Sequence, residues 1–107
     1  MDKIINRYAQ AAIKYGEAQS KGRVKLAKTQ NESMKKLRDH IKLHKDYTLD
    51  SLAVLLEHEN EYVRLKAAFG LIPVMPDDAE RVLQELTTLD SPAAKEAQMT
   101  LKIWKKQ

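Results

Sequence analysis

The chain of 107 residues contains no cysteine. This absence excludes a disulfide framework and any metal site built from thiolates. Glycine and proline are also scarce, at three residues each, which is typical of helices joined by short connections. No segment has the alternating apolar pattern of a β-strand. Together these absences favour an all-α protein.

Long apolar runs are missing as well. No stretch approaches the roughly 18 apolar residues of a membrane span, and residues 1–19 lack the continuous apolar centre of a signal peptide. Apolar residues make up 43% of the chain and charged residues 32%, a balance typical of a folded domain. Because no low-complexity linker interrupts the chain, we expect a single cytoplasmic domain over residues 1–107, without membrane association.

The net charge of +4 conceals an uneven distribution. Residues 1–46 carry 12 Lys or Arg and 5 Asp or Glu, a net charge of +7. Residues 47–107 carry 7 Lys or Arg and 10 Asp or Glu, a net charge of −3. A surface polarised in this way can steer a charged partner.

Apolar residues recur at spacings of three and four, which predicts helices. Gly22 is expected to end the first helix, and Thr48, Asn60 and Ser91 are expected to cap later ones, with Pro92 in the first helical position. The expected helices cover residues 2–20, 23–44, 48–58, 61–72 and 77–88, and a last one follows Ser91. Six helices are most simply arranged as three antiparallel hairpins.

Candidates for catalysis or metal binding are few. His40 and His44 lie four residues apart and could share a helix face, but a metal site needs a third ligand. Asp77 and Asp78 are adjacent, so their side chains do not face each other, and the start of a helix favours carboxylates for electrostatic reasons. The glycines are isolated, so no phosphate-binding loop is present. We therefore predict that the protein is not an enzyme and holds no cofactor or metal.

The strongest surface pattern is a row of lysines that begins just before the second helix and continues along it: Lys21, Lys28, Lys35 and Lys42. Seven residues make nearly two helical turns, so these side chains share one side of the helix. One interpretation is that the row binds phosphate groups or an acidic partner. The other is a solvated face on which Glu32 and Asp39 pair with lysines four residues away. We favour the solvated face, because such pairs dilute the positive potential.

The clearest local pattern lies within residues 52–74. A leucine-rich helix is followed by an asparagine turn, and then by a helix with adjacent Val and Arg and two adjacent alanines. Repeats of this kind must stack on neighbours to bury their apolar faces. The segment resembles one HEAT or armadillo repeat, through Leu52, Leu55, Leu56, Asn60, Val63, Arg64, Ala67, Ala68 and Leu71. The resemblance implies a right-handed α-α superhelix of about six helices.

The chain as a whole resembles a family of short bacterial proteins classed as a domain of unknown function. The resemblance rests on Tyr8, Gly16, Glu17 and Ala18 in the first helix, and on Glu96, Leu101 and Trp104 near the end. Small proteins of this kind resemble immunity proteins encoded beside bacterial toxins. The resemblance therefore implies a non-enzymatic protein, monomeric when free, that neutralises a cognate toxin by binding it.

If that toxin is a nuclease, the acidic C-terminal half is the better match for its basic substrate cleft. The partner-binding residues would then be Glu57, Glu59, Glu61, Asp77, Asp78 and Glu80. Two alternatives stay open. The basic N-terminal half could bind nucleic acid through the lysine row, or the protein could be a scaffold subunit.

Overall fold

The computed structural model describes residues 2–44 and 48–106, and over these ranges the protein contains helices and no strands. This confirms the predicted all-α class, and each expected helix is present with its ends shifted by two residues at most. The third helix is a 3₁₀ helix. The elements are α1 (Asp2–Ser20), α2 (Val24–Leu43), η1 (Leu49–Glu57), α3 (Glu61–Leu71), α4 (Pro76–Leu86) and α5 (Pro92–Lys105).

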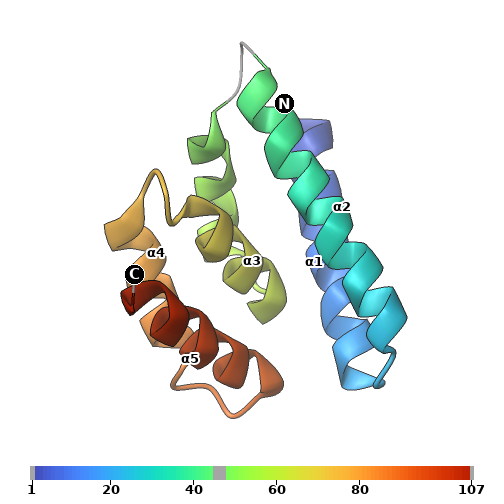
Figure 1. Cartoon of the computed structure of the whole chain (residues 1–107), viewed down its shortest axis with the longest axis vertical. Helices are drawn as coiled ribbons and strands as arrows, with labels where there is room; N and C mark the ends of the chain where they lie inside the picture. The colour runs from blue at the N-terminus through green and yellow to red at the C-terminus, as the bar shows by residue number, and fades with distance from the viewer. Residues whose placement is uncertain (1, 45–47, 107) are drawn as a thin grey trace.

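Helix α3 occupies the centre of the fold (Figure 1). The long pair α1 and α2 lies on one side of it, and the shorter pair α4 and α5 lies on the other. Eight of the eleven residues of α3 are buried, because α1, η1, α4 and α5 all contact this helix. Consecutive helices pair as predicted, α1 with α2, η1 with α3 and α4 with α5. The finer prediction of a right-handed HEAT-like superhelix stays a prediction.

The starts of the helices are fixed in different ways. Asn60 caps α3 as predicted, since its Oδ1 accepts hydrogen bonds from the amides of Tyr62 and Val63 at 2.9 and 3.2 Å. Thr48 and Ser91 occupy the equivalent positions of η1 and α5, but their side chains make no capping hydrogen bond. The prediction that these two hydroxyls act as caps was therefore wrong. Pro92 restricts the backbone at the first position of α5, so this helix begins without a side-chain cap.

The end of α1 follows the sequence pattern. Gly22 has a φ of 69°, a left-handed conformation that glycine adopts at little cost. The amide of Arg23 then donates to the carbonyl of Ala18 at 2.8 Å, which satisfies an otherwise free carbonyl at the end of the helix. This tight turn holds α1 and α2 together as a hairpin.

Replacing Asn60 by alanine is expected to lower the free energy of unfolding by about 1 kcal/mol, because two amides lose their acceptor. Ser91→Ala is the matched control. Its hydroxyl oxygen is buried without a hydrogen-bond partner in the described part of the chain, so its removal should leave stability unchanged or slightly higher. Urea denaturation of both variants measures the difference. Equal losses would contradict the capping role of Asn60.

Candidate functional site

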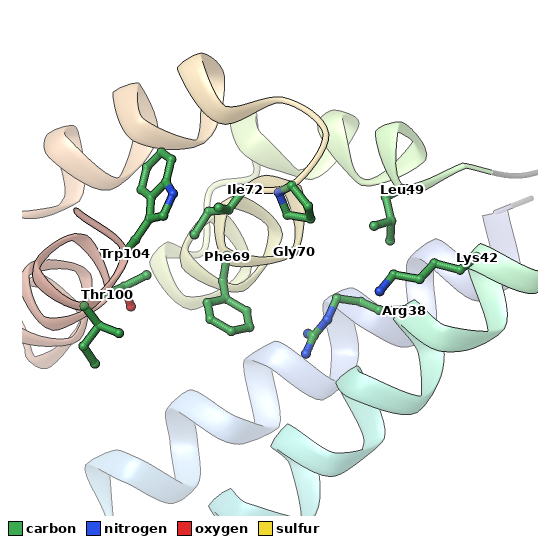
Figure 2. A pocket seen from close by; sticks show the side chains of 10 residues that line it. Arg38, Lys42, Leu49, Phe69, Gly70, Ile72, Thr100 and Trp104 are labelled. Atoms are coloured by element: carbon green, nitrogen blue, oxygen red, sulfur yellow. The ribbon is translucent and has the colours of Figure 1, made fainter. Parts of the chain in front are cut away.

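A groove separates α2 from α3 and α5 (Figure 2). Its first compartment has a volume of about 360 Å³, and Arg38 and Lys42 of α2 lie across it from Phe69, Ile72 and Trp104. A second compartment of about 340 Å³ is lined by residues nearer the start of α2, Lys28 and Lys35 among them. Arg38 and Phe69 line both compartments. The two are therefore parts of one surface, which we call the α2–α3 groove.

One wall of the groove is basic. Lys28, Lys35 and Lys42 of the predicted lysine row line it, together with Arg38. Lys21 does not, because it lies in the turn between α1 and α2 and lines separate hollows there. In residues 2–44 and 48–106 no ion pair involves any of these lysines. The expected pairing with Glu32 and Asp39 does not form. Glu32 also lines the second compartment, so the wall combines four cations with one carboxylate and its net charge is positive.

The opposite side of the groove is apolar. Phe69 is 45% exposed although its helix is almost wholly buried, and Ile103 of α5 is 61% exposed. Trp104 is half-buried and packs against the core. Its indole also lines the groove beside Ile72. Exposed aromatic and aliphatic side chains thus face the cations of α2.

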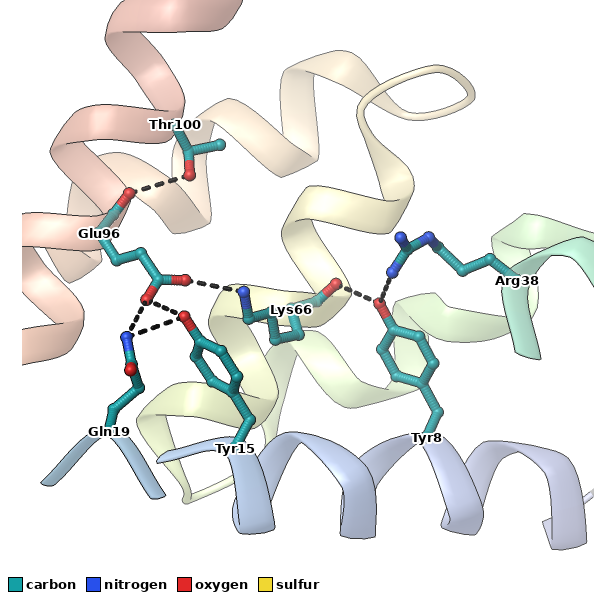
Figure 3. A network of polar contacts seen from close by, with 7 residues as sticks. All are labelled: Tyr8, Tyr15, Gln19, Arg38, Lys66, Glu96 and Thr100. Carbon is teal, nitrogen blue, oxygen red and sulfur yellow. Dashed lines mark hydrogen bonds and ion pairs between the residues drawn. The ribbon is translucent and has the colours of Figure 1, made fainter. Parts of the chain in front are cut away.

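Arg38 lies where the two compartments meet. Its guanidinium carbon is 5.1 Å from the centre of the Phe69 ring, a cation–π distance. Its Nη1 donates a hydrogen bond of 3.0 Å to the hydroxyl of Tyr8, which in turn donates to the carbonyl of Lys66 at 2.6 Å (Figure 3). Buried polar contacts therefore hold the basic wall at a fixed position relative to α3.

A buried polar network beneath the groove joins α1, α3 and α5 (Figure 3). The ammonium of Lys66 contacts Oε2 of Glu96 at 2.7 Å and lies 4.0 Å from the centre of the Tyr15 ring. The Tyr15 hydroxyl donates to Oε1 of Glu96 at 2.5 Å. Burial lowers the pKa of Lys66, although Glu96 acts in the opposite direction. Lys66 is thus committed to an internal partner, and the cations available to a ligand are those of α2.

Tyr8 and Tyr15 belong to the core, with exposures of 0% and 5%. Nothing in the sequence indicated that both hydroxyls make polar contacts. Arg38, Lys66 and Phe69 were not predicted as site residues either. The available signal was the spacing of three residues between Lys66 and Phe69, which places these two on one side of α3.

The buried tyrosines predict a loss of stability at alkaline pH. Burial raises the pKa of Tyr8, Tyr15 and Tyr62 above the usual 10.0, so the unfolded chain loses these protons at a lower pH than the folded protein. Their stabilising contribution is complete below pH 10 and decreases as the pH rises above it. The lowered pKa of Lys66 makes stability rise with pH just below pH 10.5. This effect comes from one group, whereas three tyrosines lower the stability.

Urea denaturation at pH 8 and pH 11 tests this expectation, with tyrosinate absorbance as the second readout. The protein should be less stable at pH 11. Tyr62→Phe serves as the comparison, because it removes one of the three hydroxyls and should reduce the pH dependence. Equal stability at the two pH values would contradict the expectation.

The six predicted acidic residues form two groups at opposite ends of α3. Glu57, Glu59 and Glu61 surround the turn between η1 and α3, and Asp77, Asp78 and Glu80 belong to the start of α4. The eleven residues of α3 span roughly 16 Å between the two groups. The structure does not bring the six together as one surface, and their role in partner binding stays a prediction.

Each acidic group has neighbours that modify it. In the turn, Nη1 of Arg64 donates to the carbonyls of His58 and Glu59 at 2.7 and 3.1 Å, so this arginine stabilises the backbone that carries the first group. At the start of α4, Glu80 contacts Lys105 of α5 at 2.7 Å, and Asp78 lies 3.8 Å from Arg81. The second group is therefore partly neutralised.

The histidine pair at the end of α2 does not form a metal site with other described residues. The rings of His40 and His44 lie 6.1 Å apart between centroids. Across the described ranges, no three His, Cys, Asp or Glu side chains are grouped as a metal ion would need. None of the helices described here has the length and apolarity needed to span a membrane.

Comparison with known proteins identifies the fold and the family. None of the curated proteins matches this chain. The crystal structure of the protein RPA1889 from Rhodopseudomonas palustris CGA009 is similar, with a TM-score of 0.89 and 22% sequence identity over 98% of this chain and 88% of that one. At this identity the similarity shows the fold alone. Residues 2–104 match DUF2019, a domain of unknown function, and the chain therefore belongs to the DUF2019 family.

Proposed function

We propose that this protein is a non-enzymatic protein-binding module that holds its partner in the α2–α3 groove. The observation that carries the proposal is an exposed apolar side opposite a basic wall whose lysines form no ion pair within residues 2–44 and 48–106. Exposed apolar surface with a polar rim is typical of protein-binding sites. Phe69 and Ile103 are the most exposed large apolar side chains that line the groove.

The chemistry of the groove supports binding over catalysis. A hydrolase or transferase needs a nucleophile beside a base, and the described lining of the groove includes no His, Cys or Ser. Its one hydroxyl, that of Thr100, donates a hydrogen bond of 2.9 Å to the carbonyl of Glu96. Below the groove, the carboxylate of Glu96 already accepts from Lys66 and Tyr15.

Neutralisation of a cognate toxin, which the resemblance to immunity proteins implies, is one form of this function. The groove changes the expected mode of contact. The sequence pointed to the acidic residues 57–61 and 77–80, whereas the groove offers positive charge and apolar surface. The two modes predict different contact residues on the same molecule.

Affinity purification from native cells, with the products of neighbouring genes present, tests the proposal. We expect a stable protein partner with the wild type and with the turn variant Glu59→Gln/Glu61→Gln. The groove variant Lys35→Glu/Phe69→Ser should fold, by circular dichroism, and lose the partner. Absence of any partner would contradict the binding function. Loss with the turn variant alone would assign the contact to the acidic residues instead.

A further inference from the structure

We propose that the groove binds an acidic amphipathic helix of its partner, an inference that rests on the proposed function and specifies its ligand. Three features of the groove specify this ligand: the basic wall of α2, the apolar side formed by α3 and α5, and the distance between successive cations.

The basic wall has the repeat of a helix. Lys28, Lys35 and Lys42 are seven residues apart on α2, so successive lysines are roughly 10.5 Å apart along the helix axis. A second helix laid along α2 repeats its own side chains at the same distance. Carboxylates seven residues apart on that helix therefore come opposite successive lysines. The row from Lys28 to Lys42 spans roughly 21 Å, which corresponds to a partner helix of about 15 residues.

The apolar side supplies the anchor points. Phe69 lies at the centre, where the two compartments meet, and Ile72, Ile103 and Trp104 line the first compartment. Helices that bind in grooves insert large apolar side chains spaced three, four or seven residues apart. A partner helix that carries apolar anchors on one face and carboxylates on the adjoining face is an acidic amphipathic helix.

The same features disfavour nucleic acid as the occupant. Single strands bind where bases can stack on free aromatic rings, but the Phe69 ring is already in contact with the guanidinium of Arg38 at 5.1 Å. The other aromatic ring of the lining, Trp104, is half-buried, and its centre lies 5.8 Å from the ammonium of Lys105. The remaining apolar side chains, including Leu49, Ile72 and Ile103, are aliphatic. Such side chains suit apolar anchors and offer bases neither stacking nor hydrogen bonds.

A designed peptide provides the test. The probe is a fluorescein-labelled helix of about 15 residues, with Glu every seventh position on one face and Leu and Phe on the adjoining face. Binding is followed by fluorescence anisotropy and by the emission of Trp104, the single tryptophan of the chain, which lines the groove. A peptide with Lys in place of Glu, one with Ser in place of the apolar residues, and a single-stranded oligonucleotide of similar length are the comparison ligands.

We expect the acidic peptide to bind at about 50 mM salt, to weaken at about 300 mM salt because surface charges are screened, and to shift the Trp104 emission. Lys35→Glu and Phe69→Ser should each weaken binding at least about tenfold. Lys21→Glu is the matched control, because Lys21 belongs to the same lysine row but lies outside the groove. It should bind as the wild type does.

Several outcomes would overturn the inference. These are binding of the oligonucleotide but not the peptide, equal weakening by Lys21→Glu and Lys35→Glu, or no binding of the acidic peptide at low salt. If the peptide fails while a native partner is still lost with Lys35→Glu/Phe69→Ser, the inference is wrong and the proposed function stands. If the native partner does not depend on the groove either, both are wrong.

Discussion

Replacing Glu96 by glutamine is expected to lower the free energy of unfolding by about 2–4 kcal/mol, because the substitution leaves the ammonium of Lys66 buried without a counter-charge. The Lys66 side chain is only 11% exposed, and its Nζ lies 2.7 Å from the Glu96 carboxylate. Glutamine has nearly the same shape, so packing changes little. The expected loss therefore reports on charge and hydrogen bonding, and urea denaturation at pH 7 measures it.

Lys66→Met is the matched comparison. Methionine keeps an unbranched apolar side chain against the Tyr15 ring and removes the ammonium. Glu96 is 23% exposed and keeps the hydrogen bond from Tyr15, so it remains solvated, and the expected loss is about 1 kcal/mol or less. The double variant should lose less than the sum of the single ones, since the two residues interact directly. Equal losses for Glu96→Gln and Lys66→Met would contradict this account of the network.

The second large effect is expected for Gly16→Ala, with a loss of about 1–2 kcal/mol. A Cβ atom at Gly16 would lie 2.4 Å from Cδ2 and 2.7 Å from Cγ of Tyr62. That ring is held edge-on to Tyr15 with centroids 5.8 Å apart, so it cannot withdraw freely. Overpacking of this kind costs about 1–3 kcal/mol. The better helix propensity of alanine, about 1 kcal/mol, offsets only part of it.

Gly70→Ala provides the control, because it brings the same gain in helix propensity. Its Cβ would lie 3.0 Å from Cδ of Arg38 and from Cδ1 of Leu52, and 3.2 Å from the Tyr8 hydroxyl. These contacts are relieved by shifts of a few tenths of an ångström, whereas the 2.4 Å approach at Gly16 is not. We expect a change within about 1 kcal/mol. Thermal and urea denaturation of both variants give the comparison. A Gly16→Ala protein as stable as Gly70→Ala would contradict the close approach of α1 to α3.

Local patterns were sufficient to predict the helices and several of their ends. The periodic spacing of apolar residues can be recognised within each helix separately. Asn60, Gly22 and Pro92 act on backbone groups only a few residues away. Ser91 shows the limit of such reasoning. Its residue type suits a cap, but the orientation of its hydroxyl depends on the packing around α5, and no local pattern specifies that orientation.

The groove and its network could not be predicted in the same way. Tyr15 and Glu96 are 81 residues apart in the chain and Lys66 and Glu96 are 30 apart, so only tertiary packing brings them together. The lysine row was visible as a pattern on α2. Its place beside Phe69 and Trp104, which gives it an apolar partner surface, depends on how α2 lies against α3 and α5.

The acidic residues are close in the sequence but separated by the fold. Six carboxylates within residues 57–80 suggested one surface, but α3 separates them into two groups. Glu80 lies 2.7 Å from Lys105, and this exposed pair reduces the negative potential at the start of α4. An acidic partner in the α2–α3 groove and a basic partner at these groups thus require contacts on different parts of the molecule.

Hydrogen–deuterium exchange of the protein alone and in complex with its native partner distinguishes these possibilities most directly. The account predicts slower exchange within residues 35–42 of α2, 66–73 of α3 and its following turn, and 100–104 of α5. Protection confined to residues 57–61 and 77–80, with the groove exchanging as in the free protein, would contradict it.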